Sequence, residues 1–331
     1  MIQEDDRMKS PIFIGGTGRS GTTIIAKMLG RHSQIYTYPL ETRFIIDPDG
    51  LIDLVPALST QWSPYIGSKA IKRFKYMMHA LGKNRTQVKR GINYILKKCN
   101  FFPQRYEGIQ LAKIMGKKEY ENTVNTFIDQ LIDTEFKGYW CGTDSFTIHP
   151  TIISPKRFQK DDMIQMCSRF IHELFGLALK RQNKLYFVDH TPYNILHANF
   201  LKELFPGLKL IHVYRDMRDV ICSYKTKKWG GNESRDVVFR LKQIYLCWNE
   251  IKETLPGDNY YEMKLESVIQ NPGSELKHLF RFLNIEFEKN SLDMDLSKGH
   301  VGRWIDDLNK EEKSFIKKEF KHIMEQYGYR W

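Results

Sequence analysis

The most constraining feature of the sequence is a short apolar segment that enters a glycine-rich loop and then a helix-like pattern. Residues 11–16 (PIFIGG) have the composition of a buried strand that ends in a loop. Residues 21–29 then place apolar side chains at helical spacing. With this order of elements, the N–H groups of the loop and the N-terminus of the helix converge on one point, which favours an anion. The alternative is a tight turn without a ligand.

Three later segments also have the pattern of buried strands, and helix-like stretches follow the first two. The strands are predicted at residues 184–189, 208–214 and 259–264, and the helices at residues 192–205 and 216–227. Near-continuous apolar strands that alternate with helices indicate a parallel sheet covered on both faces. The predicted fold class is therefore α/β, with a P-loop-type parallel sheet flanked by helices.

The middle of the chain has a different texture. Residues 49–183 are rich in Lys, Phe, Tyr and Met, and apolar residues recur at helical spacing over residues 71–81. We interpret this segment as a mostly helical insertion within a single domain that spans residues 1–331. The core of that domain is predicted to comprise residues 11–48 and 184–331.

The loop departs from the phosphate-binding loop of nucleoside triphosphate enzymes at one position. The pattern G-x-x-x-x-G-K-[ST] is met at Gly16, Gly21 and Thr23, but Thr22 stands where the lysine is expected. That lysine normally reaches the β- and γ-phosphates of the nucleotide. Arg19 supplies a cation inside the loop instead. The sequence therefore predicts a phosphate site that disfavours a triphosphate, and a nucleotide-dependent kinase is the leading alternative.

A second basic motif follows the strand predicted at residues 208–214. It begins at Arg215 and continues as D-M-R-D-V-I-C-S to Ser223. Because the carboxyl ends of parallel strands share one edge of a sheet, we expect Arg215 to lie at the same edge as the glycine loop. Arginine can fork onto a phosphate, and serine adds a neutral donor. Taken alone, the motif is more typical of a solvated helix start with local ion pairs.

Together the two motifs resemble those of the sulfotransferases that use 3′-phosphoadenosine 5′-phosphosulfate (PAPS). The resemblance covers roughly residues 11–45 and 184–330 and leaves the central insertion unmatched. It implies that the glycine loop binds the 5′-phosphosulfate and that Arg215 and Ser223 bind the 3′-phosphate. The segment N-Y-Y-E matches a strand beside the adenine, and K-G-H-V-G-R-W matches a loop over the cofactor. The implied cofactor-binding residues are Gly18, Arg19, Ser20, Gly21, Thr22, Thr23, Arg215, Ser223, Lys227, Tyr261, Gly302 and Arg303.

Within that family the sequence is most similar to the tyrosylprotein sulfotransferases and related bacterial enzymes. Those enzymes carry a Glu-Thr-Arg stretch with the proposed general base, and the matching residue here is Glu41. An ion pair of Glu41 with Arg43 or Arg19 is the alternative. The resemblance also implies that Arg19 stabilises the leaving phosphate. His190 stands where the family often has a lysine beside the transferring group, so it is either catalytic or a structural histidine.

The reaction that the resemblance implies is in-line transfer of a sulfuryl group from PAPS to an acceptor hydroxyl, without a metal. The insertion at residues 49–183 is expected to form the cap that binds the acceptor. The acceptor class stays open between a peptide tyrosine, a carbohydrate, a lipid and a small alcohol, because specificity lies in the least matched region.

The charge balance suggests an anionic partner of some kind. Lys and Arg number 51 against 39 Asp and Glu, which gives a formal net charge of +12. A basic nucleic-acid-binding protein is therefore the second alternative. However, the Lys and Arg residues between positions 69 and 98 recur at the spacing of a solvated amphipathic helix. A polyanionic nucleotide also accounts for part of the charge, so we expect no nucleic-acid partner.

Cysteine usage and hydropathy bear on the compartment. The five cysteines are scattered and form no C-x-x-C pair, which argues against a disulfide framework and a zinc site. No apolar run approaches the roughly 18–20 residues that span a bilayer. The charged start MIQEDDRMKS is unlike a secretory signal. We therefore expect a cytoplasmic protein without a transmembrane segment, and a homodimer is among the expected assemblies.

Overall fold

The chain folds into two compact units, which are described separately below. The computed structural model describes residues 9–83, 106, 108–138, 151–227, 230–231, 233–296 and 299–331. Unit 2 comprises Lys9–Pro39 and Leu185–Trp331, and the described part of unit 1 lies within Leu40–Lys184.

Unit 2 is built on a five-stranded sheet in which all strands are parallel. The strand order is β2-β5-β1-β6-β7. The strands are β1 (Ile12–Gly15), β2 (Ile35–Thr37), β5 (Tyr186–Asp189), β6 (Lys209–Tyr214) and β7 (Tyr260–Lys264). The central strand β1 is buried over its whole length, as expected of a strand that is covered on both faces.

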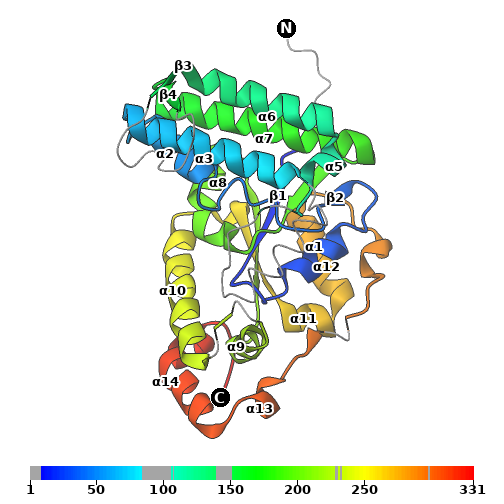
Figure 1. The fold of residues 1–331 in the computed structure, drawn as a ribbon. Coiled ribbons are helices and arrows are strands. Elements are labelled where there is room, and N and C mark those ends of the chain that lie inside the picture. The colour runs from blue at the N-terminus through cyan, green and yellow to red at the C-terminus, as the bar shows by residue number, and fades with distance from the viewer. Residues whose placement is uncertain are drawn as a thin grey trace, which may run out of the picture. The chain divides into compact units, whose positions relative to one another are not determined.

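Helices follow the strands of unit 2 and flank the sheet (Figure 1). They are α1 (Thr22–Leu29), α8 (Ala198–Leu204), α9 (Met217–Lys225), α10 (Ser234–Glu253), α11 (Leu265–Gln270), α12 (Pro272–Leu283), α13 (Trp304–Asp307) and α14 (Lys310–Gln326). The described residues of this unit also form the short 3₁₀ helices η1 (Pro192–His197), η2 (Gly257–Asn259) and η3 (Lys289–Leu292). The predicted α/β fold with a helix-flanked parallel sheet is confirmed.

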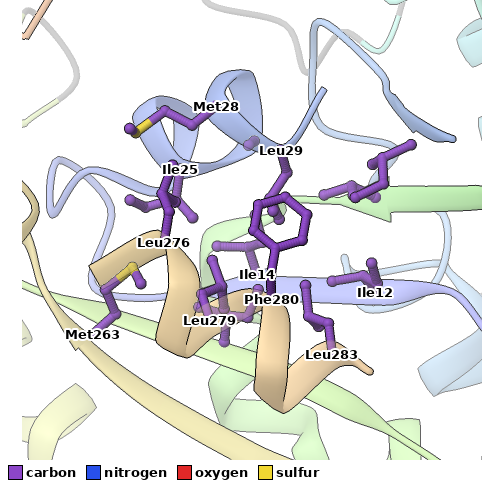
Figure 2. Close-up of a cluster of buried hydrophobic side chains, with 14 of the residues drawn as sticks. Ile12, Ile14, Ile25, Met28, Leu29, Met263, Leu276, Leu279, Phe280 and Leu283 are labelled. Atoms are coloured by element: carbon purple, nitrogen blue, oxygen red, sulfur yellow. The ribbon is translucent and has the colours of Figure 1, made fainter. Parts of the chain in front are cut away.

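One hydrophobic cluster fixes the glycine loop to the sheet, because it buries the inner face of α1 (Figure 2). Helix α12 contributes residues at positions i, i+3, i+4 and i+7, which place one apolar stripe against β1 and α1. The cluster includes Ile12, Ile14, Ile25, Met28, Leu29, Leu276, Leu279, Phe280 and Leu283. Truncation of a fully buried member such as Leu279 to alanine would cost about 2–5 kcal/mol.

Unit 1 is mainly helical and has an aromatic core. Its helices are α2 (Leu51–Leu58), α3 (Pro64–Gly82), α5 (Leu111–Met115), α6 (Lys117–Leu131) and α7 (Lys160–Gln182). Phe127 and Phe170 stack with their ring centroids 4.1 Å apart, and Phe74 meets both rings edge-on. Such offset and edge-to-face pairs add to the free energy gained by burying the rings themselves.

Two elements differ from the expectations drawn from sequence. Unit 1 contains an antiparallel pair of strands, β3 (Ile132–Lys137) and β4 (Thr151–Pro155), which the helical interpretation did not include. Strand β3 (IDTEFK) is almost entirely exposed, so it lacks the buried apolar alternation that predicts a strand. Strand β2 also went unpredicted because it has only three residues.

The remaining predicted elements of unit 2 are found in place. Strands β1, β5, β6 and β7 and helices α1 and α9 fall within the predicted ranges. The stretch predicted as one helix at residues 192–205 divides into η1 and α8. In the part of the chain that the structure describes, no helix has the length and apolar character to cross a bilayer.

Candidate functional site

The loop between β1 and α1 has a backbone conformation that favours glycine at several positions. Gly18, Arg19 and Gly21 adopt positive φ angles of 73°, 59° and 109°. A Cβ on Gly16 would clash with the Val213 carbonyl oxygen and with the Ser20 hydroxyl. Because the left-handed region costs a non-glycine residue about 1–2 kcal/mol, the contacts of Arg19 must hold it there. The sequence therefore produces a tight loop at the carboxyl end of the central strand.

The loop and the start of α1 present hydrogen-bonding groups whose partner is missing. The Ser20 hydroxyl oxygen is fully buried and has no hydrogen-bond partner among the described residues. Helix α1 begins after Gly21 without a side-chain cap. A buried polar atom without a partner costs about 1–3 kcal/mol, and such atoms are rare in native proteins. This combination leaves the loop able to donate hydrogen bonds to a ligand that carries acceptors.

The structure brings the two predicted anion motifs together. Arg19 Nε donates a hydrogen bond of 3.0 Å to Ser223 Oγ, although the two residues are 204 positions apart. Arg215 Nη1 lies 3.5 Å from the backbone oxygen of Arg19. Arg215 is buried, and its Nε has no partner among the described residues. One edge of the sheet thus gathers two guanidinium groups and two serine hydroxyls.

Helix α9 starts at this edge because Asp216 caps it. The Asp216 carboxylate accepts from the backbone N–H of Arg218 and also forms a bidentate ion pair with the Arg218 guanidinium, at 2.7–3.2 Å. The backbone N–H of Asp216 in turn donates to Glu266 Oε1. These contacts fix the first turn of α9, and with it Arg215 and Ser223.

Tyr224 holds the glycine loop through a hydrogen bond. The sequence analysis did not identify this residue. Its hydroxyl donates a hydrogen bond of 2.6 Å to the Thr17 carbonyl oxygen. Burial raises the pKa of the Tyr224 hydroxyl above its ordinary value, so the group stays a donor. The position directly after Ser223 was the only sequence signal that could have identified this residue.

The segment at residues 299–304 lies against α9. The backbone N–H groups of Gly302 and Trp304 donate to the two carboxylate oxygens of Asp219, at 2.8 Å and 3.0 Å. The Arg303 guanidinium forms an ion pair with Asp307 on the next turn. Gly302 therefore lies close to the Arg215 motif, whereas the Arg303 side chain turns to its own helix.

The carboxyl end of β5 carries a buried polar network next to the glycine loop. Asp189 accepts hydrogen bonds from Thr191 Oγ1 and Asn194 Nδ2, both at 3.0 Å. Asn194 also donates to the Ile14 carbonyl oxygen and so ties this network to β1. Among the described residues, no group of three or more His, Cys, Asp or Glu side chains could hold a metal ion.

His190 has a defined tautomer. Its Nε2 lies 3.1 Å from the Tyr38 carbonyl oxygen, and a carbonyl oxygen only accepts, so Nε2 carries the proton. In the neutral ring Nδ1 is then a hydrogen-bond acceptor. Nδ1 is buried and has no partner among the described residues. The His190 side chain is thus buried with one of its two ring nitrogens lacking a hydrogen-bond partner among the described residues.

Comparison with known families decides the assignment. A family model described as "Sulfotransferase family" matches residues 11–87 and 119–289, which is most of the chain. The chain belongs to the sulfotransferase family. No curated protein matched.

One solved structure agrees with this assignment at the level of the fold, and a second is reported beside it. The sulfotransferase domain of the Synechococcus PCC 7002 olefin synthase is 14% identical, with a TM-score of 0.51 over 99% of this chain and 98% of that chain. The sulfotransferase domain of the curacin biosynthetic pathway is 16% identical, with a TM-score of 0.49 over 98% and 99% of the two chains. The likeness to the olefin synthase domain shows a shared fold and no more than that.

Three other predicted site residues of this sulfotransferase have local surroundings of their own. Glu41 belongs to unit 1, where its carboxylate forms an ion pair with Arg43. Tyr261 lies on β7, and its ring stacks on Phe282 with the centroids 5.4 Å apart. Lys227 follows the end of α9 and is half-buried. Arg19, Ser20, Arg215, Ser223 and Gly302 form the gathered group.

Proposed function

We propose that this sulfotransferase moves a sulfuryl group from PAPS to an acceptor hydroxyl. The observation that carries the proposal is the meeting of Arg19, Ser223 and Arg215 at one edge of the sheet. These residues come from the two motifs on which the resemblance to PAPS-dependent enzymes rests. The unpartnered Ser20 Oγ and Arg215 Nε fit a ligand that brings phosphate oxygens as acceptors.

Binding of the donor rests on the groups of unit 2. The loop residues Gly18 to Thr23 are proposed to hold the 5′-phosphosulfate through backbone N–H groups and the Ser20 hydroxyl. Arg215 and Ser223 are proposed to hold the 3′-phosphate. We retain Lys227, Tyr261, Gly302 and Arg303 as further nucleotide contacts. Of these, Arg303 must leave Asp307 to make its contact, because its guanidinium is engaged there.

Sulfuryl transfer requires positioning and electrostatics more than covalent chemistry by the protein, as in the related phosphoryl transfers. An acceptor hydroxyl must lose its proton as it attacks, and the bridging oxygen of the leaving phosphate must be stabilised. Arg19 is proposed to stabilise that oxygen, since among the described residues its guanidinium has one hydrogen bond, from Nε to Ser223. Glu41 is proposed to take the acceptor's proton.

His190 receives a narrower role than the lysine that it replaces. With Nε2 donating to the Tyr38 carbonyl, the neutral ring offers a lone pair at Nδ1, whereas a lysine offers only donors. His190 therefore has to be protonated before it can contact the sulfonate as a cation.

Ligand-dependent thermal stability tests the donor. A ligand at a free concentration of 100 times its Kd stabilises the native state by about 2.7 kcal/mol. This raises the Tm of a protein of this size by a few degrees. Adenosine 3′,5′-bisphosphate without magnesium is expected to give this shift. Stabilisation by magnesium ATP alone would instead favour a kinase. Two observations disfavour a kinase: Thr22 replaces the phosphate-binding lysine, and the Asp189 carboxylate already accepts hydrogen bonds from Thr191 and Asn194.

Labelled PAPS tests the transfer itself. Peptide tyrosines, carbohydrates, lipids and small alcohols are offered in parallel, and transfer of label to one class identifies the acceptor. A protein that binds adenosine 3′,5′-bisphosphate but labels none of these classes would contradict the proposed reaction. Salt-sensitive binding to generic DNA would instead support the nucleic-acid alternative.

A further inference from the structure

Asp219, in the first turn of α9, is a buried charge that the proposed chemistry does not use. Its carboxylate is fully buried. Oδ2 accepts from the backbone N–H of Gly302 at 2.8 Å, and Oδ1 accepts from the backbone N–H of Trp304 at 3.0 Å. Hydrogen bonds to an ionised acceptor are about twice as strong as neutral ones. One carboxylate therefore holds the segment at residues 299–304 at two points.

The same carboxylate faces Arg215. Arg215 Nη2 lies 3.5 Å from Asp219 Oδ2 and donates a hydrogen bond of 2.7 Å to the His300 carbonyl oxygen. Arg215 Nη1 points to the Arg19 carbonyl oxygen. The Asp219–Arg215 pair thus joins helix α9, the segment at residues 299–304 and the glycine loop. Both side chains are buried, so each depends on the other for a counter-charge.

The segment at residues 299–304 needs such an anchor, because its backbone is not intrinsically favoured. His300 and Gly302 adopt positive φ angles of 47° and 80°. A second anchor is the stack of the Arg218 guanidinium on the Trp304 ring, 3.8 Å from its centroid. Both anchors come from α9, so the placement of the segment follows the placement of that helix.

We propose that Asp219 is a positioning residue of the nucleotide site, which presents Arg215 Nε to a phosphate by holding Arg215 against the segment at residues 299–304. The inference rests on the proposed function for the identity of the ligand. It has a counter-intuitive consequence, because Asp219 is an anion beside a site for anions. On charge alone, its removal would free Arg215 and tighten phosphate binding; if Asp219 acts by positioning, its removal weakens binding.

The nucleotide affinity of the Asp219→Asn variant decides whether removal of this charge tightens or weakens phosphate binding. We expect the Kd for adenosine 3′,5′-bisphosphate to rise about 10-fold and the KM for PAPS to rise with it, while the KM for the acceptor stays unchanged. Asp293→Asn is the matched control, since Asp293 pairs with Arg31 at the surface of the same unit. An unchanged or lower Kd for Asp219→Asn would overturn the proposal.

Amide hydrogen exchange of the ligand-free protein tests the anchor without any nucleotide. In Asp219→Asn, one oxygen is replaced by an NH₂ group that cannot accept, so the amide of Gly302 or of Trp304 is expected to exchange about 10- to 100-fold faster. Unchanged exchange at both amides would refute the positioning role. If wild-type protein binds no nucleotide, the proposed function fails, and the exchange result still decides whether Asp219 anchors the segment.

Gly302→Ala keeps the proposal testable if Asp219→Asn fails to fold. Among the described residues, a Cβ on Gly302 would meet Ile305 Cδ1 alone, at 3.9 Å, so the substitution strains φ without a clash there. This variant loosens the segment while Asp219 stays intact, and it too should weaken adenosine 3′,5′-bisphosphate binding. Wild-type affinity in Gly302→Ala, despite faster exchange at residue 304, would mean that the segment does not position Arg215.

Discussion

The two units differ in which polar side chains they bury. Among the described residues of unit 1, the buried polar side chains include the hydroxyls of Thr42, Ser59, Ser68 and Tyr120, and no buried side chain is charged. Unit 2 buries charged groups as well, including Arg215, Arg218, Asp216 and Asp219. Burial of a charge is costly unless partners compensate for it, so a fold that retains several has a use for them.

The partners of these buried groups show what that use is. Ser68 Oγ in unit 1 accepts a hydrogen bond from the Ile153 backbone N–H, so its bonding is internal. In unit 2, Ser20 Oγ and Arg215 Nε have no partner among the described residues. Unsatisfied buried groups of this kind mark a place for a ligand, whereas satisfied ones mark a place in the scaffold. The comparison therefore supports the proposal that unit 2 binds the anion.

The strongest challenge to this division is Glu41, the predicted catalytic residue in unit 1. We expect Glu41→Gln to lower kcat about 10²- to 10⁴-fold, because general-base catalysis supplies a factor of this size, and to leave nucleotide affinity unchanged. Steady-state kinetics and nucleotide titration measure both effects. Asp47→Asn is the control, since Asp47 pairs with the same Arg43 at 3.0 Å. Equal losses in both variants would mean that Glu41 acts only through Arg43.

A matched pair of serine substitutions sharpens the comparison. Ser20→Ala should weaken adenosine 3′,5′-bisphosphate binding about 10-fold and leave the free energy of unfolding unchanged or higher, because an unsatisfied buried hydroxyl is removed. Ser68→Ala should cost about 1–2 kcal/mol of stability, since it leaves the Ile153 N–H unpaired, without an effect on nucleotide affinity. Denaturant unfolding and ligand titration of both variants check this. The reverse pattern would break the assignment of the two units.

The smallest expected effect concerns Glu262, a half-buried carboxylate of unit 2 whose oxygens accept hydrogen bonds. Burial opposes the ionisation of Glu262, but hydrogen bonds from His212 and Trp248 outweigh it and lower the pKa of Glu262 to about 2. Because this value is below the ordinary 4.5, the carboxylate stabilises the fold fully above about pH 4.5 and loses that effect as the pH falls toward 2.

The Glu262→Gln variant should therefore have a lower free energy of unfolding than the wild type at neutral pH. Below about pH 4.5, its free energy of unfolding should fall less steeply with falling pH than that of the wild type. Urea unfolding across that range measures the difference. The exposed Glu253, at the end of α10, is the control, and Glu253→Gln should keep the wild-type profile. A Glu262→Gln profile parallel to that of the wild type at low pH would show that Glu262 contributes no such linkage.

Much of unit 2 was predictable because its elements follow from local patterns. The apolar run of β1, the glycines and the helical spacing of α1 predict a strand, a loop and a helix without knowledge of the rest of the chain. The hairpin of β3 and β4 was missed, because an exposed strand carries no hydrophobic alternation. Asp219 was also missed, since its carboxylate is satisfied by the backbone of a segment more than 80 positions away.

The sequence by itself determined the conformation of the glycine loop, because backbone sterics at Gly18 and Gly21 and the start of α1 are local properties. The tertiary structure alone decided which side chains complete it. It paired Arg19 with Ser223 and joined Asp219 to Gly302 and Trp304. Such pairings depend on how distant segments pack against one sheet edge. A sequence pattern does not specify the distances between segments that are far apart in the chain. The pairings between them are therefore determined only in the folded protein.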